Sequence, residues 1–380
     1  MMLHSYVGKE IVVILILMSF VILWERYVPS IPSSAFAVVL GMFVSIFFGG
    51  MDDSSLRFTS ELFLYLLLPP IIFHSSLNFK LETLRTTWLS SLTFAWLGTF
   101  LAVCLIAWGI CVWCGLYHHD ILMVESLILA SILAPTDTVS TISMSKNLKM
   151  KDRYILDVLE NESVMNDAMS VVLFHLFSKI SSLDSWVPIE VIGFSILYSC
   201  IAVGLGLCSA KAMKYVNVDV VPVHYIVALL IYAICEWTGL SGILCLFSYG
   251  SYCRVPDEVR HTMKSVSALF ESYVYLMLGL ELQSYDTSLF GLSFLILTSC
   301  IVARVVTVFI LGGCLRACGR DKWTPRSLMF FSMCGVRGAI SYALTSSQSQ
   351  FMRGTTFVVI ISTILSMGIF QKCMYKILLE

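Results

Sequence analysis

The sequence predicts an all-α polytopic membrane protein that crosses the bilayer thirteen times. Its 380 residues are 58% hydrophobic and 13% charged, about half the charged fraction of an ordinary soluble domain. The mean hydropathy is +0.86, and the stretches 11–23, 92–112 and 357–370 contain no charged residue. A spanning helix needs only about 20 apolar residues. This composition excludes a soluble enzyme, a disordered protein and a nucleic-acid binder.

Short polar gaps divide the hydrophobic stretches into thirteen predicted spans. They cover residues 10–28, 35–50, 61–78, 88–117, 121–145, 155–180, 186–212, 220–237, 238–254, 265–283, 288–315, 326–349 and 354–376. Because the gaps are short, we expect a single transmembrane domain over residues 1–380 without a cytoplasmic regulatory tail. The first span lacks a basic leader and a small-residue cleavage site, so we expect it to be retained.

Lysine and arginine orient these spans, because short cytoplasmic loops collect them. Of the 24 basic residues, 18 lie in alternate loops on one side and 4 on the other. This asymmetry predicts an N-terminus outside and a C-terminus in the cytoplasm. The remaining two, Arg304 and Arg337, fall inside predicted spans.

Thirteen spans divide into two inverted six-helix repeats, residues 1–180 and 220–380, joined by a linking helix at 186–212. The fifth and twelfth spans then correspond, and both are interrupted, by Ser-Ile-Leu-Ala-Pro-Thr-Asp at 131–137 and by Cys-Gly-Val-Arg-Gly at 334–338. Paired broken helices in two inverted halves indicate a substrate site near the membrane midplane. We therefore expect two crossed discontinuous helices.

Charges inside the spans are the candidate functional residues, because each costs at least about 2.5–3.5 kcal/mol near the bilayer centre. They are Asp137, Glu162, Asp167, Glu271, Arg304 and Arg337. The sixth span also carries Ser163 and Asn166, and residues four apart share one face of a helix. Such hard oxygen ligands suit Na⁺, Li⁺ or H₃O⁺ better than a soft metal.

The availability of an oppositely charged partner suggests a different role for each of these charged residues. A lone buried carboxylate takes up a proton, so we expect Glu162 to pair with Arg304, with Glu271 as the next carboxylate to consider. Asp167 is then left to bind Na⁺ or a proton in competition. Helix ends at the breaks carry partial charges, which we expect Asp137 and Arg337 to offset. Thr136 and Asp137 are expected to line the site through unwound backbone.

The sixth span also carries a recognisable motif. Asn161-Glu-Ser-Val-Met-Asn-Asp-Ala-Met-Ser-Val-Val-Leu-Phe resembles the GESLLNDAxxVVL signature of the sodium/proton exchangers (NHE/NhaP type) of the monovalent cation:proton antiporter-1 family. Four further motifs follow the order of that family: Leu-Leu-Pro-Pro-Ile-Ile-Phe at 67–73, the crossing segment 131–140, Phe270-Glu271 with Leu278-Gly279, and Gly-Val-Arg-Gly-Ala-Ile-Ser at 335–341. The resemblance covers the chain from about residue 30.

The resemblance implies the antiporter fold, in a homodimer whose core domain slides elevator-fashion. The Asn166-Asp167 pair implies electroneutral exchange of one Na⁺, or Li⁺ or K⁺, for one proton, serving intracellular pH and sodium homeostasis in the plasma membrane or an organelle membrane. The partners implied are monovalent cations, protons, the lipid bilayer and a second copy. We expect no nucleic acid and no cofactor apart from the transported ions.

Three positions depart from the family pattern. Pro135 precedes Asp137 instead of following it, and Asn161 replaces the leading glycine of the sixth-span motif. His74 stands where the family usually has an acid after its Pro-Pro motif. If that acid tunes the ion path, then Pro69, Pro70, Phe73 and His74 line the path and the pH response is altered.

Two other classes of protein remain as alternatives. An intramembrane aspartyl protease would use Asp137 and Asp167 as two aspartates sharing a proton, but its Gly-x-Gly-Asp motif is missing. A binding-only channel or receptor leaves the paired broken helices unexplained.

Overall fold

The structure, a computed structural model, describes residues 2–28, 32–48, 63–79, 81–137, 153–182, 188–216, 220–284, 290–319, 323–345 and 348–379. Within these ranges the chain forms helices and no strand, as the composition predicts. The α-helices are α1 (Met2–Tyr27), α2 (Ser33–Phe48), α4 (Leu68–Asn78), α5 (Leu81–Leu92), α6 (Thr99–Leu116), α7 (Met123–Leu133), α9 (Arg153–Ser181), α10 (Pro188–Val216), α11 (Val221–Trp237), α12 (Gly242–Tyr252), α13 (Asp257–Leu280), α14 (Phe290–Ala317), α15 (Pro325–Met333), α16 (Ala339–Thr345) and α17 (Gln350–Leu379). Two π-helical segments, η1 (Phe63–Leu67) and η2 (Thr93–Gly98), and one 3₁₀ segment, η3 (Glu281–Ser284), extend them.

Every predicted span overlaps one or more of these helices, and several helices extend beyond the predicted spans. α13 begins at Asp257 instead of 265, and α5 begins at Leu81 instead of 88. Polar residues at these ends continue the helix, whereas hydropathy marks only its apolar part. By length and composition, three helical stretches of the described residues could cross a membrane, namely Thr83–Leu116, Gly193–Tyr215 and Phe290–Ala317, and six shorter apolar helices accompany them. The number of spans, the repeats and the orientation stay predictions.

The helix interruptions fall where the sequence predicts them. α7 ends at Leu133 and residues 134–137 are not helical, a segment we call the α7 break. The remainder of the predicted fifth span, 138–145, lies outside the described residues. α15 and α16 are separated by residues 334–338, which we call the α15–α16 break.

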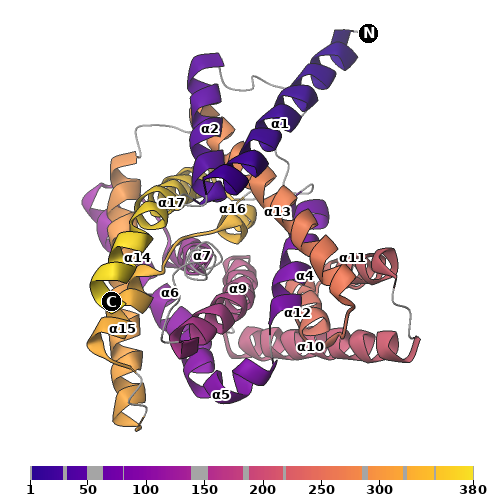
Figure 1. Cartoon of the computed structure of the whole chain (residues 1–380). Coiled ribbons are helices and arrows are strands. Elements are labelled where there is room, and N and C mark those ends of the chain that lie inside the picture. Colours follow the sequence, from indigo (N-terminus) through magenta and orange to yellow (C-terminus); the bar gives the residue numbers. More distant parts are fainter. Residues whose placement is uncertain are drawn as a thin grey trace.

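The helices pack in two groups. α5, α6, α7, α9, α14, α15, α16 and α17 contact one another and form the crossing group, while α1, α2, α4, α10, α11, α12 and α13 form the flanking group. α7 and α16 lie near the middle of the molecule, between α14 and α15 on one side and α10, α11 and α12 on the other (Figure 1). The two breaks therefore lie inside the protein.

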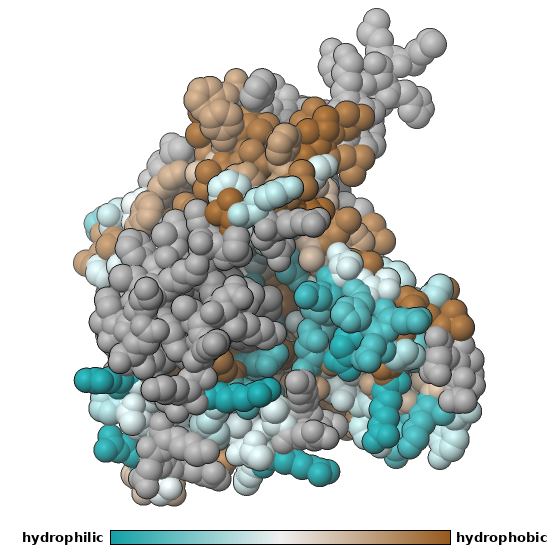
Figure 2. Space-filling model, in the orientation of Figure 1, coloured by the Kyte–Doolittle hydropathy of each residue, from teal (hydrophilic) through white to brown (hydrophobic). Residues whose placement is uncertain are grey.

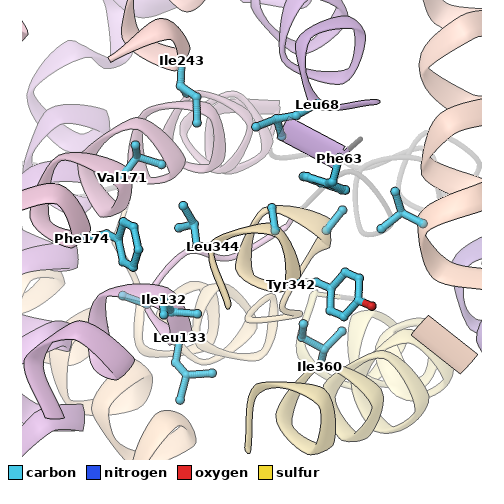
Figure 3. Close-up of a cluster of buried hydrophobic side chains, with 14 of the residues drawn as sticks. Phe63, Leu68, Ile132, Leu133, Val171, Phe174, Ile243, Tyr342, Leu344 and Ile360 are labelled. Atoms are coloured by element: carbon cyan, nitrogen blue, oxygen red, sulfur yellow. The ribbon is translucent and has the colours of Figure 1, made fainter. Parts of the chain in front are cut away.

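A shared hydrophobic core joins the two groups around the breaks. Ile132 and Leu133 at the end of α7 face Val171 of α9 and Leu344 of α16, with Phe63 of η1 close by (Figure 3). In a bilayer, where lipid is as apolar as these side chains, close van der Waals packing stabilises this contact. It also separates the unwound backbone from the bilayer.

The outer surface is strongly apolar. Leu15 on α1, Ile46 on α2, Trp108 on α6 and Ile196 on α10 are all exposed, and hydrophobic residues gather over α1 and α2 (Figure 2). A soluble monomer rarely exposes contiguous apolar patches of this kind. This surface fits contact with lipid.

Glycines allow the closest helix contact in the flanking group. A Cβ atom added at Gly279 on α13 would lie 2.3 Å from the Val38 carbonyl oxygen and 2.9 Å from the Cα of Gly41 on α2. Small residues that let two backbones approach are a common device of membrane helix packing. The Leu278-Gly279 motif is thus explained by packing.

We predict that Gly279→Ala destabilises the protein by about 1–3 kcal/mol, because the added methyl group forces α2 and α13 apart. Gly204→Ala on α10 is the matched control, since a Cβ there meets nothing within 4 Å. Thermal unfolding of the purified variants measures both effects. Equal melting temperatures for the two variants would contradict the prediction.

Candidate functional site

The two breaks cross and bond to each other. The backbone N–H of Asp137 in the α7 break donates to the carbonyl oxygen of Val336 in the α15–α16 break at 2.7 Å. Pro135 cannot donate a helical hydrogen bond, and Gly335 and Gly338 favour a non-helical chain. In the described part of the chain, the segment after α7 thus meets the interruption between α15 and α16. That both crossing helices are discontinuous stays a prediction, because residues 138–152 lie outside the described ranges.

Gly338 permits this crossing. A Cβ atom at Gly338 would lie 2.7 Å from the Cβ of Asp137 and 3.0 Å from its Oδ2. No other residue type fits so close a contact without displacing the aspartate. The Asp137 carboxylate therefore lies beside the residue that precedes α16, at the positive end of that short helix.

Arg337 lies at the C-terminal end of α7, which carries a partial negative charge. Its side chain is buried, with 3% of the residue exposed, and Nη1 donates to the carbonyl oxygens of Ala134 at 2.5 Å and Pro135 at 3.0 Å. Its backbone N–H donates to Oγ1 of Thr363 on α17 at 3.1 Å. The guanidinium thus supplies donors to the carbonyls that the end of α7 leaves unpaired.

α9 presents hydroxyl and amide groups to the α7 break. Ser163 Oγ donates to the Thr136 carbonyl oxygen at 3.0 Å, and Asn166 Nδ2 donates to Thr136 Oγ1 at 2.9 Å. The structure therefore brings together three predicted site residues, which hold the unwound chain against one face of α9.

Asp167 lies next to this cluster and is half-buried. The carboxylates of Asp137 and Glu162 are close enough to repel its charged form. Among the described residues, no group donates a hydrogen bond to it. A carboxylate in this setting gains from a bound proton or cation.

Glu162 and Arg304 form a two-point ion pair. Nη1 and Nη2 of Arg304 donate to Oε1 and Oε2 of Glu162 at 2.5 and 3.1 Å, and the two side chains are 11% and 1% exposed. Arg304 also lies over the Phe331 ring, 5.1 Å from its centroid. Glu162 is thereby turned towards α14, as its five-residue separation from Asp167 indicates.

The other predicted residues lie further along the neighbouring helices. Glu271 on α13 accepts a hydrogen bond from Ser267 at 2.7 Å, and Arg304 pairs with Glu162 instead. Phe73 stacks on Tyr249 of α12 with centroids 5.6 Å apart, and Pro69 and Pro70 are buried beside it. His74 Nε2 lies 3.0 Å from Asn78 Nδ2. An ion path along this segment stays a prediction.

Tyrosine hydroxyl groups are site residues that the sequence did not reveal. Tyr275 on α13 donates to Asp137 Oδ2 at 3.0 Å, and Tyr342 on α16 donates to Glu281 of η3 at 2.5 Å. Asn161 donates to Thr87 Oγ1 on α5 at 3.0 Å, a contact that the family glycine could not make. A charge inside an apolar span is conspicuous, whereas a hydroxyl group is not.

In the described ranges, no group of three or more His, Cys, Asp or Glu side chains is arranged to hold a metal ion. A transported cation would instead meet one carboxylate with hydroxyl, amide and carbonyl oxygens.

The contact between the α7 break and the α15–α16 break, with buried charges of both signs beside it, is the pattern of the antiporter fold. The structure aligns with that of the sodium proton antiporter MjNhaP1 from Methanocaldococcus jannaschii with a TM-score of 0.78 and 18% identity, over 100% of this chain and 99% of that chain. A family model described as sodium/hydrogen exchanger, transmembrane, matches residues 12–380. The chain belongs to the sodium/hydrogen exchanger family.

Curated relatives agree with this assignment. Sodium/hydrogen exchanger 8 of Mus musculus is 29% identical over 349 residues, covering 82% of this chain and 60% of that protein. Sodium/hydrogen exchanger 4 of Arabidopsis thaliana is 28% identical over 387 residues, covering 87% and 71%. The chain spans about 60% of the length of the exchanger 8 relative. The family match makes it a multi-pass integral membrane protein and gives no support to the protease alternative.

We predict strong coupling between Glu162 and Arg304. Glu162→Gln or Arg304→Gln alone should cost about 3–5 kcal/mol, because each leaves a buried charge uncompensated. The double variant should recover part of the loss. Melting temperatures in a double-mutant cycle measure the coupling, and Arg316→Gln, at an exposed arginine of α14, is the control. Additive losses would show that the two charges do not stabilise each other.

Proposed function

We propose that this chain is a secondary active antiporter that exchanges one Na⁺, or Li⁺ or K⁺, for one H⁺, electroneutrally. The observation that carries the proposal is Asp167, a half-buried carboxylate without a hydrogen-bond donor among the described residues, beside the crossing of two broken helices. The two curated relatives reported above carry the name sodium/hydrogen exchanger, and MjNhaP1 is titled a sodium proton antiporter.

The charge balance of the cluster supports a stoichiometry of one to one. Three carboxylates, Asp137, Glu162 and Asp167, lie near two guanidinium groups, Arg304 and Arg337. With all five ionised, the cluster has a net charge of −1. Either one proton or one monovalent cation on Asp167 brings this charge to zero, so the two loaded states carry equal charge.

The site as proposed uses oxygen atoms from three elements. Asp167, Asn166 and Ser163 come from α9, and Thr136 and Asp137 from the α7 break. Glu162 with Arg304 is a structural pair, and Arg337 and Asp137 offset the helix ends. The transported ions are the ligands, and no resident cofactor is part of the proposal.

The working cycle we propose is of the elevator type. The crossing group carries the breaks and every proposed ligand, whereas the flanking group exposes an apolar face on α1 and α2 (Figure 2). Thirteen spans in two inverted repeats, an outside N-terminus and a homodimer in the bilayer complete the proposal, with pH and sodium homeostasis as the role.

Asp167→Asn is predicted to abolish exchange, because the amide can neither release a proton nor neutralise a cation. Na⁺-driven proton movement in proteoliposomes measures the activity, with Asp120→Asn as the control at an exposed aspartate. The variant should keep its melting temperature. Substantial Na⁺-driven proton flux through Asp167→Asn would exclude this residue as the carrier.

We also predict that the cycle is electrically silent and has a bell-shaped pH dependence. Excess protons displace the cation from the single carboxylate. Too few protons slow the return step, in which the carboxylate carries a proton across the membrane. Currents on a solid-supported membrane, recorded beside proton flux from the same preparation, test this. A steady current proportional to turnover would refute one-for-one exchange.

A further inference from the structure

A small polar cavity lies behind the proposed ion site, on the side of Asn166 that faces α14. Its lining includes Glu162, Asn166, Arg304, Thr307, Arg337 and Gly98. The cavity volume open to a water-sized molecule is about 10 Å³, which is close to the minimum that holds one water molecule.

Four lining residues each carry one buried polar atom that makes no hydrogen bond within the described structure. These atoms are Asn166 Oδ1, Arg304 Nε, Arg337 Nε and Thr307 Oγ1. Asn166, Arg337 and Thr307 are only 2%, 3% and 3% exposed. Buried polar atoms nearly always have a partner in folded proteins, so four of them around one cavity indicate a shared ligand.

Thr307 departs from the usual behaviour of a helical threonine. Thr298 on the same helix donates to the Leu295 carbonyl oxygen at 2.6 Å, which satisfies its hydroxyl group locally. Thr307 makes no such bond among the described residues, and its Cγ2 lies 3.6 Å from the position of a Cβ on Gly98. Its methyl group faces η2, and its hydroxyl group is left for the cavity.

The chemistry of the four atoms selects the ligand. Two guanidinium N–H groups donate, the Asn166 amide oxygen accepts, and the Thr307 hydroxyl group can accept, which matches the two acceptor and two donor positions of water. An anion cannot donate to Asn166 Oδ1 and is repelled by Glu162, whereas a cation is repelled by both arginines. A neutral ligand that both donates and accepts fits these atoms, and water is small enough for a cavity of about 10 Å³.

We propose that this cavity binds one structural water molecule, and that Thr307 is a positioning residue that acts through this water on Asn166. The inference rests on the proposed function for its effect on transport. Asn166 Nδ2 already donates to Thr136 at 2.9 Å. The water fixes the other end of the amide, so that Asn166 keeps one orientation beside Asp167.

The transport test uses the full chain in proteoliposomes. Thr307→Val keeps the shape and removes the hydroxyl group; it should raise the KM for Na⁺ about three- to tenfold, the effect of one lost hydrogen bond, with an unchanged maximal rate. Thr307→Ser should restore the wild-type KM, and Thr298→Val is the matched control. A wild-type KM in Thr307→Val overturns the positioning role. Absence of exchange in the wild type would instead refute the proposed function.

The site itself is tested independently of transport. A density map of the wild-type protein in lipid nanodiscs, at a resolution that shows ordered water, should contain one peak within hydrogen-bond distance of the four atoms. The peak should be lost or displaced in Thr307→Val. A cavity closed by side-chain rearrangement, or a peak too strong for water in a map recorded in bromide buffer, overturns the assignment to water.

Discussion

The structure depends on the bonding of one unwound segment to another. Inside a bilayer every backbone polar group must be satisfied within the protein, so a helix can be broken only where another part of the chain replaces its lost hydrogen bonds. Here the Asp137 N–H bonds to Val336, and Arg337 serves the carbonyls of Ala134 and Pro135. Each break supplies what the other lacks. These hydrogen bonds between the two breaks require a glycine at position 338, because a side chain there would displace Asp137.

Electrostatics then assign different tasks to similar residues. Glu162 and Asp167 lie on one helix five positions apart, about 140° around its axis. Glu162 meets a guanidinium in a two-point pair, whereas Asp167 meets only like charge among its described neighbours. The same carboxyl chemistry therefore gives one compensated group and one whose charge no described neighbour offsets. The difference between Glu162 and Asp167 comes from Arg304 on α14, which pairs with Glu162 alone of the two, and not from the acids themselves.

Features that are costly in lipid were predictable from the sequence. Charges and helix-breaking residues inside apolar spans must have partners, so both breaks, the bond-forming face of α9 and the pairing of Glu162 with Arg304 followed from spacing and charge alone. Tyr275 and Thr307 were not predictable, because a hydroxyl group is tolerated almost anywhere in a helix and its partner is decided by tertiary packing. The π-helical segments η1 and η2 were missed for a related reason, since one extra residue per turn leaves hydropathy unchanged.

Two tyrosine hydroxyl groups link the crossing group to the flanking group at the site. Tyr275 of α13 donates to Asp137, and Tyr342 of α16 donates to Glu281. Tyr275 also bonds to the backbone of Ala339 on α16. The apolar core of Ile132, Leu344 and their neighbours surrounds the breaks, and its contacts are not directional. Sliding of one group against the other, as in the proposed cycle, would break these hydrogen bonds. The Glu162–Arg304 pair and the crossing lie within one group and can move intact. An ordinary hydrogen bond contributes a net free energy of about 0.5–1.5 kcal/mol, so these bonds can break and re-form readily. A buried ion pair between the two groups would resist such movement.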